Sequence, residues 1–423
     1  MSVATDVTII GAGPYGLSIA AYLRGHGIDC RIVGSPMHTW RTHMPKGMFL
    51  KSAGLSATMF DPEGLFSLKQ YCQAHDIPYQ DEGLPISLEL FAQYGMAFQK
   101  HFAPDIEEAK VTSLAHCTEG FELKLDNEVS FKSRKVVMAV GIDYFRHLPK
   151  PLSALPRELY SHSAEHYTLD KFNGQEVIVI GSGSSAIDMA VLLHEAKAKV
   201  HLIARRGELS FGTEEGDSRT WLDRLIAPMS GLGPGWKNLL CADAPWLFRY
   251  LPDNFRLRTV KEFLGPSGGW FIKNRLKPVP VILGHLLQQA YVDNGRPHLR
   301  FISKDGKERI LSADHVIAAT GYKPDLQRIE FLHHDLLGEI NMICKTPRLN
   351  AHFESSVPGL YFAGPATANT FGPVMRFAIG AGFAARQITK HVLRNSERAP
   401  VLRPANDNAV QKEPAAVRSQ YQR

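Results

Sequence analysis

One pattern occurs twice in this chain, and it limits the possible folds more than any other feature. The first copy is DVTII, then GAGPYG, then LSIAAYLRGHG, with glycines at Gly11, Gly13 and Gly16. A short β-rich run, a glycine cluster and apolar residues at helical spacing predict a strand, a tight turn and a helix. About 170 residues later, EVIVIGSGSSAIDMAVLLHEAKAKVHLIARR repeats the same order.

Each glycine position in such a loop has a physical role in holding a dinucleotide. The first allows the sharp turn, the second leaves room for a pyrophosphate, and the third lets the helix pack close to the strand. The N–H groups at the start of the helix then face the phosphates. The second loop has Gly181, Gly183 and Ala186, and alanine is an accepted variant in the third place. We therefore predict two dinucleotide sites.

The end of the second loop's next strand indicates which dinucleotide binds there. An acidic residue is usual at that position, where it binds the ribose. Here the position is Ala204, followed by Arg205 and Arg206. Because a carboxylate repels a 2′-phosphate and guanidinium groups bind it, this loop favours NADPH over NADH.

The corresponding position after the first loop is Gly34, which has no carboxylate either. NADPH needs an electron acceptor, and FAD, with its own adenosine pyrophosphate, suits the first loop. We expect Ser35 or His38 to hydrogen-bond the adenosine ribose and Arg41 to reach a phosphate.

Composition excludes several other classes. The chain has 423 residues, 44% hydrophobic and 21% charged, with no apolar run long enough to span a membrane and no signal-peptide pattern, so we expect a cytoplasmic protein. No two of the five cysteines lie within three residues of each other, which removes a CxxC redox pair and a paired-cysteine metal site. The basic residues are scattered, so we expect no nucleic-acid binding.

The order of the predicted elements gives an α/β fold with two nested Rossmann-like dinucleotide-binding domains. Residues 1–155 and 315–395 form the predicted FAD domain, which is interrupted by an NADPH domain at 156–314. A helical insertion is expected at about 215–275, because aromatic residues there follow a mostly helical spacing. The polar segment 396–423 is predicted to be disordered.

At this point the chain resembles the flavin-containing monooxygenases and the amino-acid N-hydroxylating monooxygenases, over residues 6 to about 394. The resemblance rests on the two loops, AATGY at 318–322, GLYFAG at 359–364 and THMPKGM at 42–48. In the family, ATGY lies at the domain junction and GLYFAG returns the chain to the FAD domain. The resemblance also implies that a helix beginning near FGPVM (371–375) directs N–H groups at the flavin.

Three departures from the family pattern limit what can be transferred. His162 and Ser163 match the fingerprint F-x-G-x3-H-x3-(F/W), but Pro156 and Glu158 replace its Phe and Gly, which removes most support for Baeyer–Villiger chemistry. Pro365 follows GLYFAG where reductases of the wider superfamily have Asp. Gly34 is the third departure.

The resemblance implies an FAD-dependent, NADPH-using monooxygenase that oxygenates a nitrogen or sulfur centre of a small molecule with O2, through a flavin C4a-hydroperoxide. The cofactors carry this chemistry, which agrees with the absence of a visible catalytic triad. The candidate catalytic residues are His43, Lys51 and Asn369, with Arg376 also near the flavin and no metal. The candidate cofactor residues are Gly11, Gly13, Pro14, Gly16, Ser35, Trp40, Arg41, Gly181, Gly183, Ser184, Ser185, Arg205, Arg206, Thr320, Gly321, Gly364, Phe371 and Gly372.

Ordinary structural roles remain open for several of these residues. Lys51 is either a ligand for a substrate carboxylate or a solvated loop lysine, and Asn369 and Thr370 are either site residues or helix N-caps. Two other functions also remain open: an NADPH-dependent reductase of a protein or quinone, and a non-catalytic dinucleotide-binding protein. The substrate and the oligomeric state cannot be read from the sequence.

Overall fold

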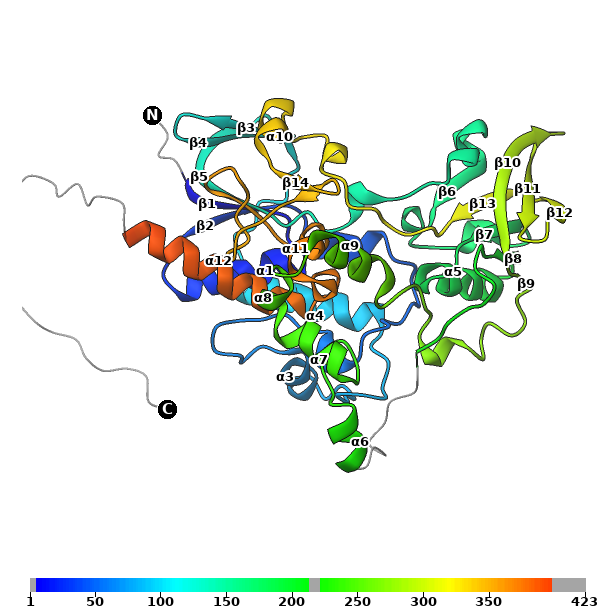
Figure 1. Cartoon of the computed structure of the whole chain (residues 1–423), viewed down its shortest axis with the longest axis horizontal. Coiled ribbons are helices and arrows are strands. Elements are labelled where there is room, and N and C mark those ends of the chain that lie inside the picture. Colours follow the sequence, from blue (N-terminus) through cyan, green and yellow to red (C-terminus); the bar gives the residue numbers. More distant parts are fainter. Residues whose placement is uncertain (1–4, 213–220, 398–423) are drawn as a thin grey trace, which may run out of the picture.

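The structure is a computed structural model that describes residues 5–212 and 221–397 (Figure 1). The predicted disordered tail lies outside the described residues, except for its first two positions, which end the last helix. No helix in the described ranges is long and apolar enough to cross a membrane.

The first glycine loop belongs to a six-stranded sheet with the order β2-β1-β5-β4-β3, and β16 pairs with β5. The strands β2, β1, β5 and β16 are parallel, whereas β3, β4 and β5 form the antiparallel meander expected from the sequence. The bounds are β1 Thr5–Ile10, β2 Cys30–Val33, β3 Val111–Cys117, β4 Gly120–Leu125, β5 Ser130–Met138 and β16 Leu360–Phe362.

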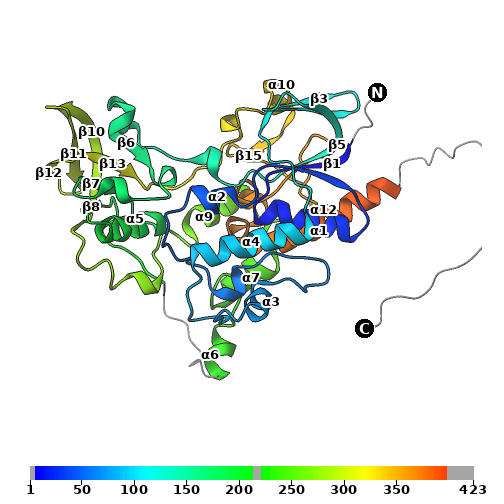
Figure 2. The ribbon, with the colours of Figure 1, turned by 180° about the vertical axis from the view of Figure 1, so that it is seen from behind.

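Helix α1 (Pro14–Gly25) is the centre of this domain. Its residues from Tyr15 to Leu23 are all buried, because the sheet covers one side and α12 (Gly380–Glu397) and α4 (Leu88–Phe102) pack on the others (Figures 1 and 2). A helix that is apolar on all sides needs such a position. The shorter helices of the domain are α2 His38–Thr42, α3 Leu68–Ala74, α10 His334–Glu339 and α11 Ala368–Phe371, and β14 Met342–Ile343 pairs with β15 Thr346–Pro347.

The predicted start of the final helix near residue 371 is wrong. Gly372 has φ +91° and Pro373 follows it, so the chain turns out of α11, makes a 3-10 turn η10 (Pro373–Arg376) and begins α12 only at Gly380. A proline cannot continue a helix from the preceding turn. Asn369 and Thr370 consequently lie inside α11 and do not cap a helix.

The second glycine loop lies in a five-stranded sheet with the order β6-β13-β7-β8-β9, in which every pairing is parallel. Helix α5 (Ser184–Glu195) covers one face, and the antiparallel sheet β10-β11-β12 packs its apolar side chains on the other. The strands are β6 Tyr160–His162, β7 Glu176–Ile180, β8 Lys199–Ile203, β9 Val281–Ile282, β10 His285–Asp293, β11 Arg296–Ser303, β12 Glu308–Ser312 and β13 His315–Ala318.

Sheet pairing corrects one domain boundary. A boundary at residue 315 would place strand β13 in the FAD domain. In the structure β13 pairs with β6 and β7 of the second sheet. The chain therefore returns to the first domain after Ala318 and not before His315.

The predicted insertion is helical, but it packs mainly on the first domain. Its helices are α6 Trp221–Ile226, α7 Trp236–Asp243, α8 Pro245–Phe248 and α9 Asp253–Glu262. Helices α8 and α9 lie against α11, and α7 lies against η10. Arg256 is buried and donates to the carbonyl of Asn369 at 3.0 Å, which fastens α9 to α11.

Burial of one carboxyl group in α5 makes the free energy of unfolding depend on pH. Asp188 is 2% exposed, and its Oδ2 accepts a hydrogen bond from Ser184 at 3.0 Å. Burial raises the pKa of Asp188 to about 7. Because the folded-state pKa lies above the unfolded value, the protein loses stability as pH rises from about 4 to about 7, and the loss is complete above pH 7.

We therefore predict that Asp188→Asn stabilises the protein at pH 8 and has little effect near pH 4. The expected gain is on the order of a few kcal/mol, at about 1.4 kcal/mol per pKa unit. Melting temperatures of wild type and variant across this pH range provide the measurement, with the exposed Asp170→Asn as control. A difference in melting temperature between variant and wild type that is the same at every pH would contradict the raised pKa of Asp188.

Candidate functional site

The first glycine loop has the geometry of a phosphate cradle. A Cβ placed on Gly16 would lie 1.9 Å from the carbonyl oxygen of Gly11, so helix and loop are in direct backbone contact. At Gly13, by contrast, no described atom lies within 4 Å of such a Cβ. Gly13 is the N-cap of α1, and Pro14 begins the helix. The space above Gly13 and the free N–H groups beside it therefore fit a pyrophosphate.

Gly34 is incompatible with the usual ribose carboxylate for a steric reason. Its φ is +135°, and a Cβ on it would lie 3.3 Å from the Cα of Gly11. The segment after it folds back over the loop, since the N–H of Met37 donates to the carbonyl of Ala12 at 2.9 Å. Contacts to an adenosine ribose in this region are thus left to backbone groups and to Ser35, which lies partly exposed beside Gly34.

The two glycine loops are built in the same way. A Cβ on Gly11 would lie 2.3 Å from the carbonyl oxygen of Ala139, and a Cβ on Gly181 would lie 2.3 Å from that of Ala319. Ala139 follows β5 and Ala319 follows β13, so each loop packs on the carboxyl end of a neighbouring parallel strand. Ligands of open parallel sheets bind at this edge.

The ATGY segment (319–322) begins at Ala319, the residue whose carbonyl lies against the second loop. The hydroxyl of Thr320 donates to the carbonyl of His147, and the carbonyl of Gly321 accepts from the N–H of His147 at 2.9 Å. His162, fully buried, has its pKa lowered to about 4 by burial, and its ring lies 3.2 Å from the same carbonyl. Its neutral ring therefore donates a hydrogen bond from Nε2 to this carbonyl. This bond holds the segment around His162 against the ATGY segment.

The two arginines after β8 have different neighbours. Arg206 is exposed, and its guanidinium lies 3.4 Å from where a Cβ on Gly265 would be. Arg205 is also exposed and lies close enough to His147 to contribute to lowering the pKa of that imidazole, after burial and two other cations. No carboxylate in the described ranges forms an ion pair with either arginine.

The segment 264–269 covers the second loop. A Cβ on Gly183 would lie 3.3 Å from the Cβ of Pro266, so the space above Gly183 is narrower than that above Gly13. The N–H of Gly212 donates to the carbonyl of Gly268 at 2.9 Å, which holds the end of the insertion beside the loop. Ser184 and Ser185 begin α5 beneath this cover.

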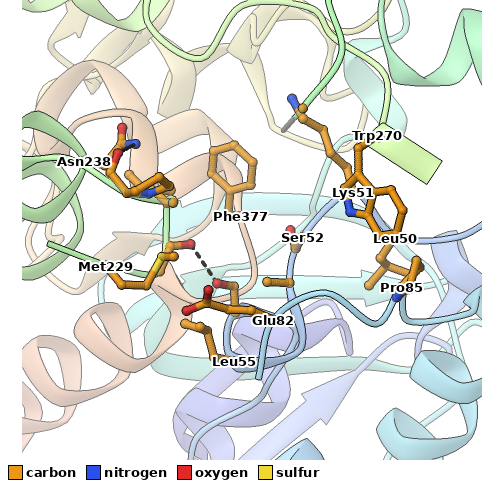
Figure 3. A pocket seen from close by; sticks show the side chains of 18 of the residues that line it. Leu50, Lys51, Ser52, Leu55, Glu82, Pro85, Met229, Asn238, Trp270 and Phe377 are labelled. Carbon is orange, nitrogen blue, oxygen red and sulfur yellow. Dashed lines mark hydrogen bonds between the residues drawn. The ribbon is translucent and has the colours of Figure 1, made fainter. Parts of the chain in front are cut away.

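A cavity of about 380 Å³ lies beside these loops (Figure 3). Its walls come from three parts of the chain: the first domain, the helical insertion and the segment that covers the second glycine loop. The first contributes 50–53, Leu55, Ser56, 82–85 and Phe377, the second 229–234 and Asn238, and the third Leu264, Ser267 and 269–271, with Gly212 completing the lining. The size and mixed walls are those of a small-molecule site.

Lys51 lies at this cavity with Arg376 nearby outside the lining, and neither forms an ion pair with a carboxylate of the described chain. Lys51 lines the cavity, and its ammonium donates to the hydroxyl of Ser267. Burial, followed by the charge of Arg376, lowers the pKa of Lys51. The guanidinium of Arg376 donates to the carbonyl of Phe263 at 2.8 Å, near the end of α9. Carbonyls at a helix C-terminus attract cations.

Three predicted residues lie away from the cavity. His43 ends α2, and its Nε2 lies 3.2 Å from the guanidinium of Arg146 at the junction of the domains. Burial lowers the pKa of His43, and Arg146 adds to the effect while Asp143 opposes it. Asn369 donates its side-chain amide to Thr346 at 2.9 Å, and the fully buried Phe371 stacks on Phe353.

The remaining candidates have mostly structural contacts. Trp40 packs edge-on against Phe91, and exposed Arg41 donates to the carbonyl of Pro36 at 3.2 Å. Gly364 lies next to Tyr15 of α1, which places GLYFAG at the first loop. Gly372 packs against the ring of Phe248.

Sequence reasoning missed the residues that cover the second loop. These residues are Pro266 and Ser267, which lie in the hexapeptide GPSGGW at 265–270. The dense glycine and proline in that hexapeptide were the available signal, because such a loop allows close backbone approach to another loop. Nothing in the sequence alone showed which loop it contacts.

Two glycine loops on two parallel sheets, with a cavity next to the segment that covers the second loop, define a two-dinucleotide oxidoreductase. A family profile described as pyridine nucleotide-disulphide oxidoreductase matches residues 8–228, and the chain belongs to this family. All five cysteines are free. An oxidoreductase built for FAD and NADP(H) is thus confirmed at the level of family and fold.

Known relatives divide between reductases and monooxygenases. The chain is 25% identical over 319 residues to a ferredoxin–NADP reductase of Sulfurisphaera tokodaii, covering 73% of this chain and 76% of the relative. It is 23% identical over 350 residues to an indole-3-pyruvate monooxygenase of Oryza sativa subsp. japonica, covering 75% and 77%. The ornithine N-hydroxylase of Kutzneria sp. 744 has a TM-score of 0.74 at 14% identity, covering 93% of this chain and 100% of that one. The predicted resemblance to this superfamily is confirmed for the fold.

The different surroundings of Gly13 and Gly16 lead to a matched prediction. Gly16→Val should lower the melting temperature of the cofactor-free protein, because overpacking against a backbone carbonyl costs about 1–3 kcal/mol. Gly13→Val should leave that temperature near wild type and lower FAD retention by about tenfold or more, since its side chain enters the phosphate space. Thermal melting and the absorbance of bound flavin distinguish the effects of the two variants. Equal melting temperatures of Gly16→Val and Gly13→Val would contradict the different roles of the two glycines.

Arg205 and Arg206 predict cofactor selectivity. Replacing Arg205 and Arg206 together by alanine should raise the KM for NADPH by about ten- to a hundredfold, because charge-assisted hydrogen bonds are worth about 1.5–3 kcal/mol. The KM for NADH should change little. Steady-state NAD(P)H oxidation measures this, with the exposed Arg309→Ala on β12 as control. Equal losses with both cofactors would show that the arginines do not read the 2′-phosphate.

Proposed function

We propose that this protein is an FAD-dependent, NADPH-using monooxygenase that oxygenates a nitrogen or sulfur centre of a small molecule. The observation that carries the proposal is the cavity bounded by both domains and by the insertion. A monooxygenase has to hold its substrate away from bulk water beside the flavin, and a cavity with walls from three parts of the chain suits this need. A reductase of a protein acceptor needs a flavin edge exposed to that protein.

The first loop is the proposed FAD site and the second the NADPH site. When bound, FAD accepts a hydride from NADPH and activates O2, and the protein supplies binding and orientation. Gly13, Pro14 and the start of α1 hold the FAD pyrophosphate in this proposal. Arg205 and Arg206 hold the 2′-phosphate of NADPH. Since Pro266 lies over Gly183, we expect segment 264–269 to shift when NADPH enters.

Lys51 is the proposed anchor for an anionic group of the substrate. It projects into the cavity, its ammonium has no carboxylate partner in the described chain, and Arg376 adds a second positive charge nearby. A substrate carboxylate would relieve the repulsion between these cations. Positioning by a fixed charge brings the reacting nitrogen or sulfur to the flavin in one orientation.

His43 and Asn369 enter this proposal only as positioning residues. Neither lines the cavity, and the amide of Asn369 is already bonded to Thr346. No protein acid or base is required at the reacting atoms by the geometry.

A reductase is the second candidate, and the sequence relatives favour it. Several ferredoxin–NADP reductases align with the chain, including one with 25% identity over three quarters of it. Such an enzyme would use the same two loops and pass electrons to a protein or quinone. The cavity and the ammonium of Lys51 have no evident role in that reaction.

The deciding experiment measures O2 uptake, NADPH oxidation and product together on the FAD-loaded enzyme. Amines and thioethers bearing a carboxylate are the probes. We expect oxygenated product in proportion to NADPH consumed, and Lys51→Met should raise the KM for these probes by about tenfold while the exposed Lys46→Met does not. Rapid NADPH oxidation that yields only peroxide, together with efficient reduction of ferredoxin or a quinone without O2, would replace the monooxygenase by the reductase.

A further inference from the structure

One short segment of the chain belongs to both candidate sites. Residues 264–268, which we call the strap, have the sequence LGPSG. Leu264 and Ser267 line the cavity, whereas Pro266 lies over Gly183 of the second glycine loop. Because neighbouring residues of one segment contact two sites, a movement of the strap at one site changes the other site as well.

The strap is anchored at both ends. Before its first residue, Arg376 donates to the carbonyl of Phe263 at 2.8 Å. At its last residue, the N–H of Gly268 donates to the carbonyl of Ser210 at 2.9 Å, and the carbonyl of Gly268 accepts from the N–H of Gly212 at 2.9 Å. Movement is therefore confined to the residues between these two anchors.

The residues between the anchors can change conformation at low cost in free energy. Leu264 has φ +51°, in the left-handed region that is unfavourable for a leucine, so a turn away from this conformation relieves strain. Gly265 has no side chain and accepts a wide range of backbone angles. The strap can therefore turn about Leu264 and Gly265 while its anchors stay in place.

One side-chain bond holds the strap over the second loop. The ammonium of Lys51, in the first domain, donates to the hydroxyl of Ser267. Ser267 directly follows Pro266, whose Cβ lies 3.3 Å from where a Cβ on Gly183 would be, whereas the same position at Gly13 is open. A pyrophosphate at the second loop needs this space. The bond between Lys51 and Ser267 therefore opposes the binding of NADPH.

An anion is a better partner for the ammonium of Lys51 than a serine hydroxyl. A carboxylate adds Coulombic attraction, which a neutral hydroxyl lacks. The charge of Arg376 lies close to Lys51, and burial and this charge lower the pKa of Lys51, so a carboxylate also relieves repulsion between two cations. An anionic substrate in the cavity therefore draws the ammonium away from Ser267 and releases the strap.

The strap also contacts the proposed ligand of the 2′-phosphate. The guanidinium of Arg206 lies 3.4 Å from where a Cβ on Gly265 would be. When Arg206 turns toward a phosphate, the strap loses this neighbour between its first anchor and Pro266. Both anions, the substrate carboxylate and the 2′-phosphate, consequently act on the strap in the same direction.

We infer that Ser267 is a positioning residue that couples the two sites: its bond to Lys51 keeps the strap over the second loop, and an anionic substrate frees this loop for NADPH. The inference rests on the proposed roles of Lys51 and of the second loop. By linkage, bound NADPH strengthens the binding of the anion by the same factor. The coupling favours oxidation of NADPH when substrate is present and so limits its use without product.

Binding of NADP+ to the FAD-loaded protein tests this coupling without turnover. Hexanoate is the probe, since it carries a carboxylate but no nitrogen or sulfur to oxygenate, and hexanol is its uncharged control. We expect hexanoate to lower the Kd of NADP+ by about fivefold or more, the lower end of typical coupling between sites, and hexanol to leave it unchanged. Isothermal titration calorimetry measures both values.

Two variants test whether the coupling passes through the bond between Lys51 and Ser267. Ser267→Ala and Lys51→Met should each lower the Kd of NADP+ without hexanoate and make it insensitive to hexanoate. Combining them should add nothing, because both remove the same bond. The exposed Ser153→Ala is the matched control and should behave as wild type. Melting temperatures confirm that the variants are folded.

A third variant acts on the obstruction itself. Pro266→Gly removes the ring above Gly183 and should also lower the Kd of NADP+, with the bond between Lys51 and Ser267 still available.

Several outcomes would overturn the inference. If Ser267 were a ligand of NADP+ or only supported the fold, Ser267→Ala would raise the Kd. A hexanoate effect that persists in Ser267→Ala would show that the coupling takes another route, and a wild-type Kd that hexanoate does not change would show that there is none. Failure of the proposed function is seen separately, as absence of oxygenated product from the amine and thioether probes.

Discussion

Close backbone packing between α1 and the loop that precedes it is the constraint on which the rest of the structure depends. Gly16 leaves only enough room for its hydrogen against the carbonyl of Gly11, so α1 starts directly at the end of β1. Tyr15, in the same loop, is buried and donates to the carbonyls of Met375 and Phe377 at 3.0 and 2.9 Å. The loop that opens the first domain thereby also fixes the turn before α12. Phe377 in that turn is part of the cavity wall.

The shape of the cavity depends on this packing and on contacts that the insertion makes with both domains. The insertion leaves the second domain, packs its helices on the first and returns over the second glycine loop. Arg376 binds the end of α9 and lies close to Lys51, which contacts Ser267 of the returning segment. A cation that is needed to hold the helix end thus also contributes to the charge of the site. Movement of segment 264–269 would change both the contact of Ser267 with Lys51 and the space above Gly183.

Local regularity explains which features were predictable. Both strand–glycine–helix units, the meander β3–β5 and the helical insertion have strong periodicity or turn residues, and each was anticipated. The start of α12 was misplaced because apolar spacing continues through FGPVM, while Gly372 and Pro373 break the helix. The boundary at 315 was wrong because β13 can be assigned to a sheet only by its partners. Of the candidate catalytic residues, Lys51 lines the cavity, whereas His43 and Asn369 do not.

The sequence by itself determined the two dinucleotide loops, the absence of a redox cysteine pair and the unusual residues at Gly34 and Arg205–Arg206. These are local properties, because a glycine in a tight turn or a charge after a strand acts through its immediate neighbours. Only the tertiary structure decided that a side chain at Gly34 would crowd the backbone of Gly11, that Pro266 covers the second loop and that Lys51 lies near Arg376. Those facts join residues far apart in the chain, and such contacts are set by how the two sheets and the insertion pack together.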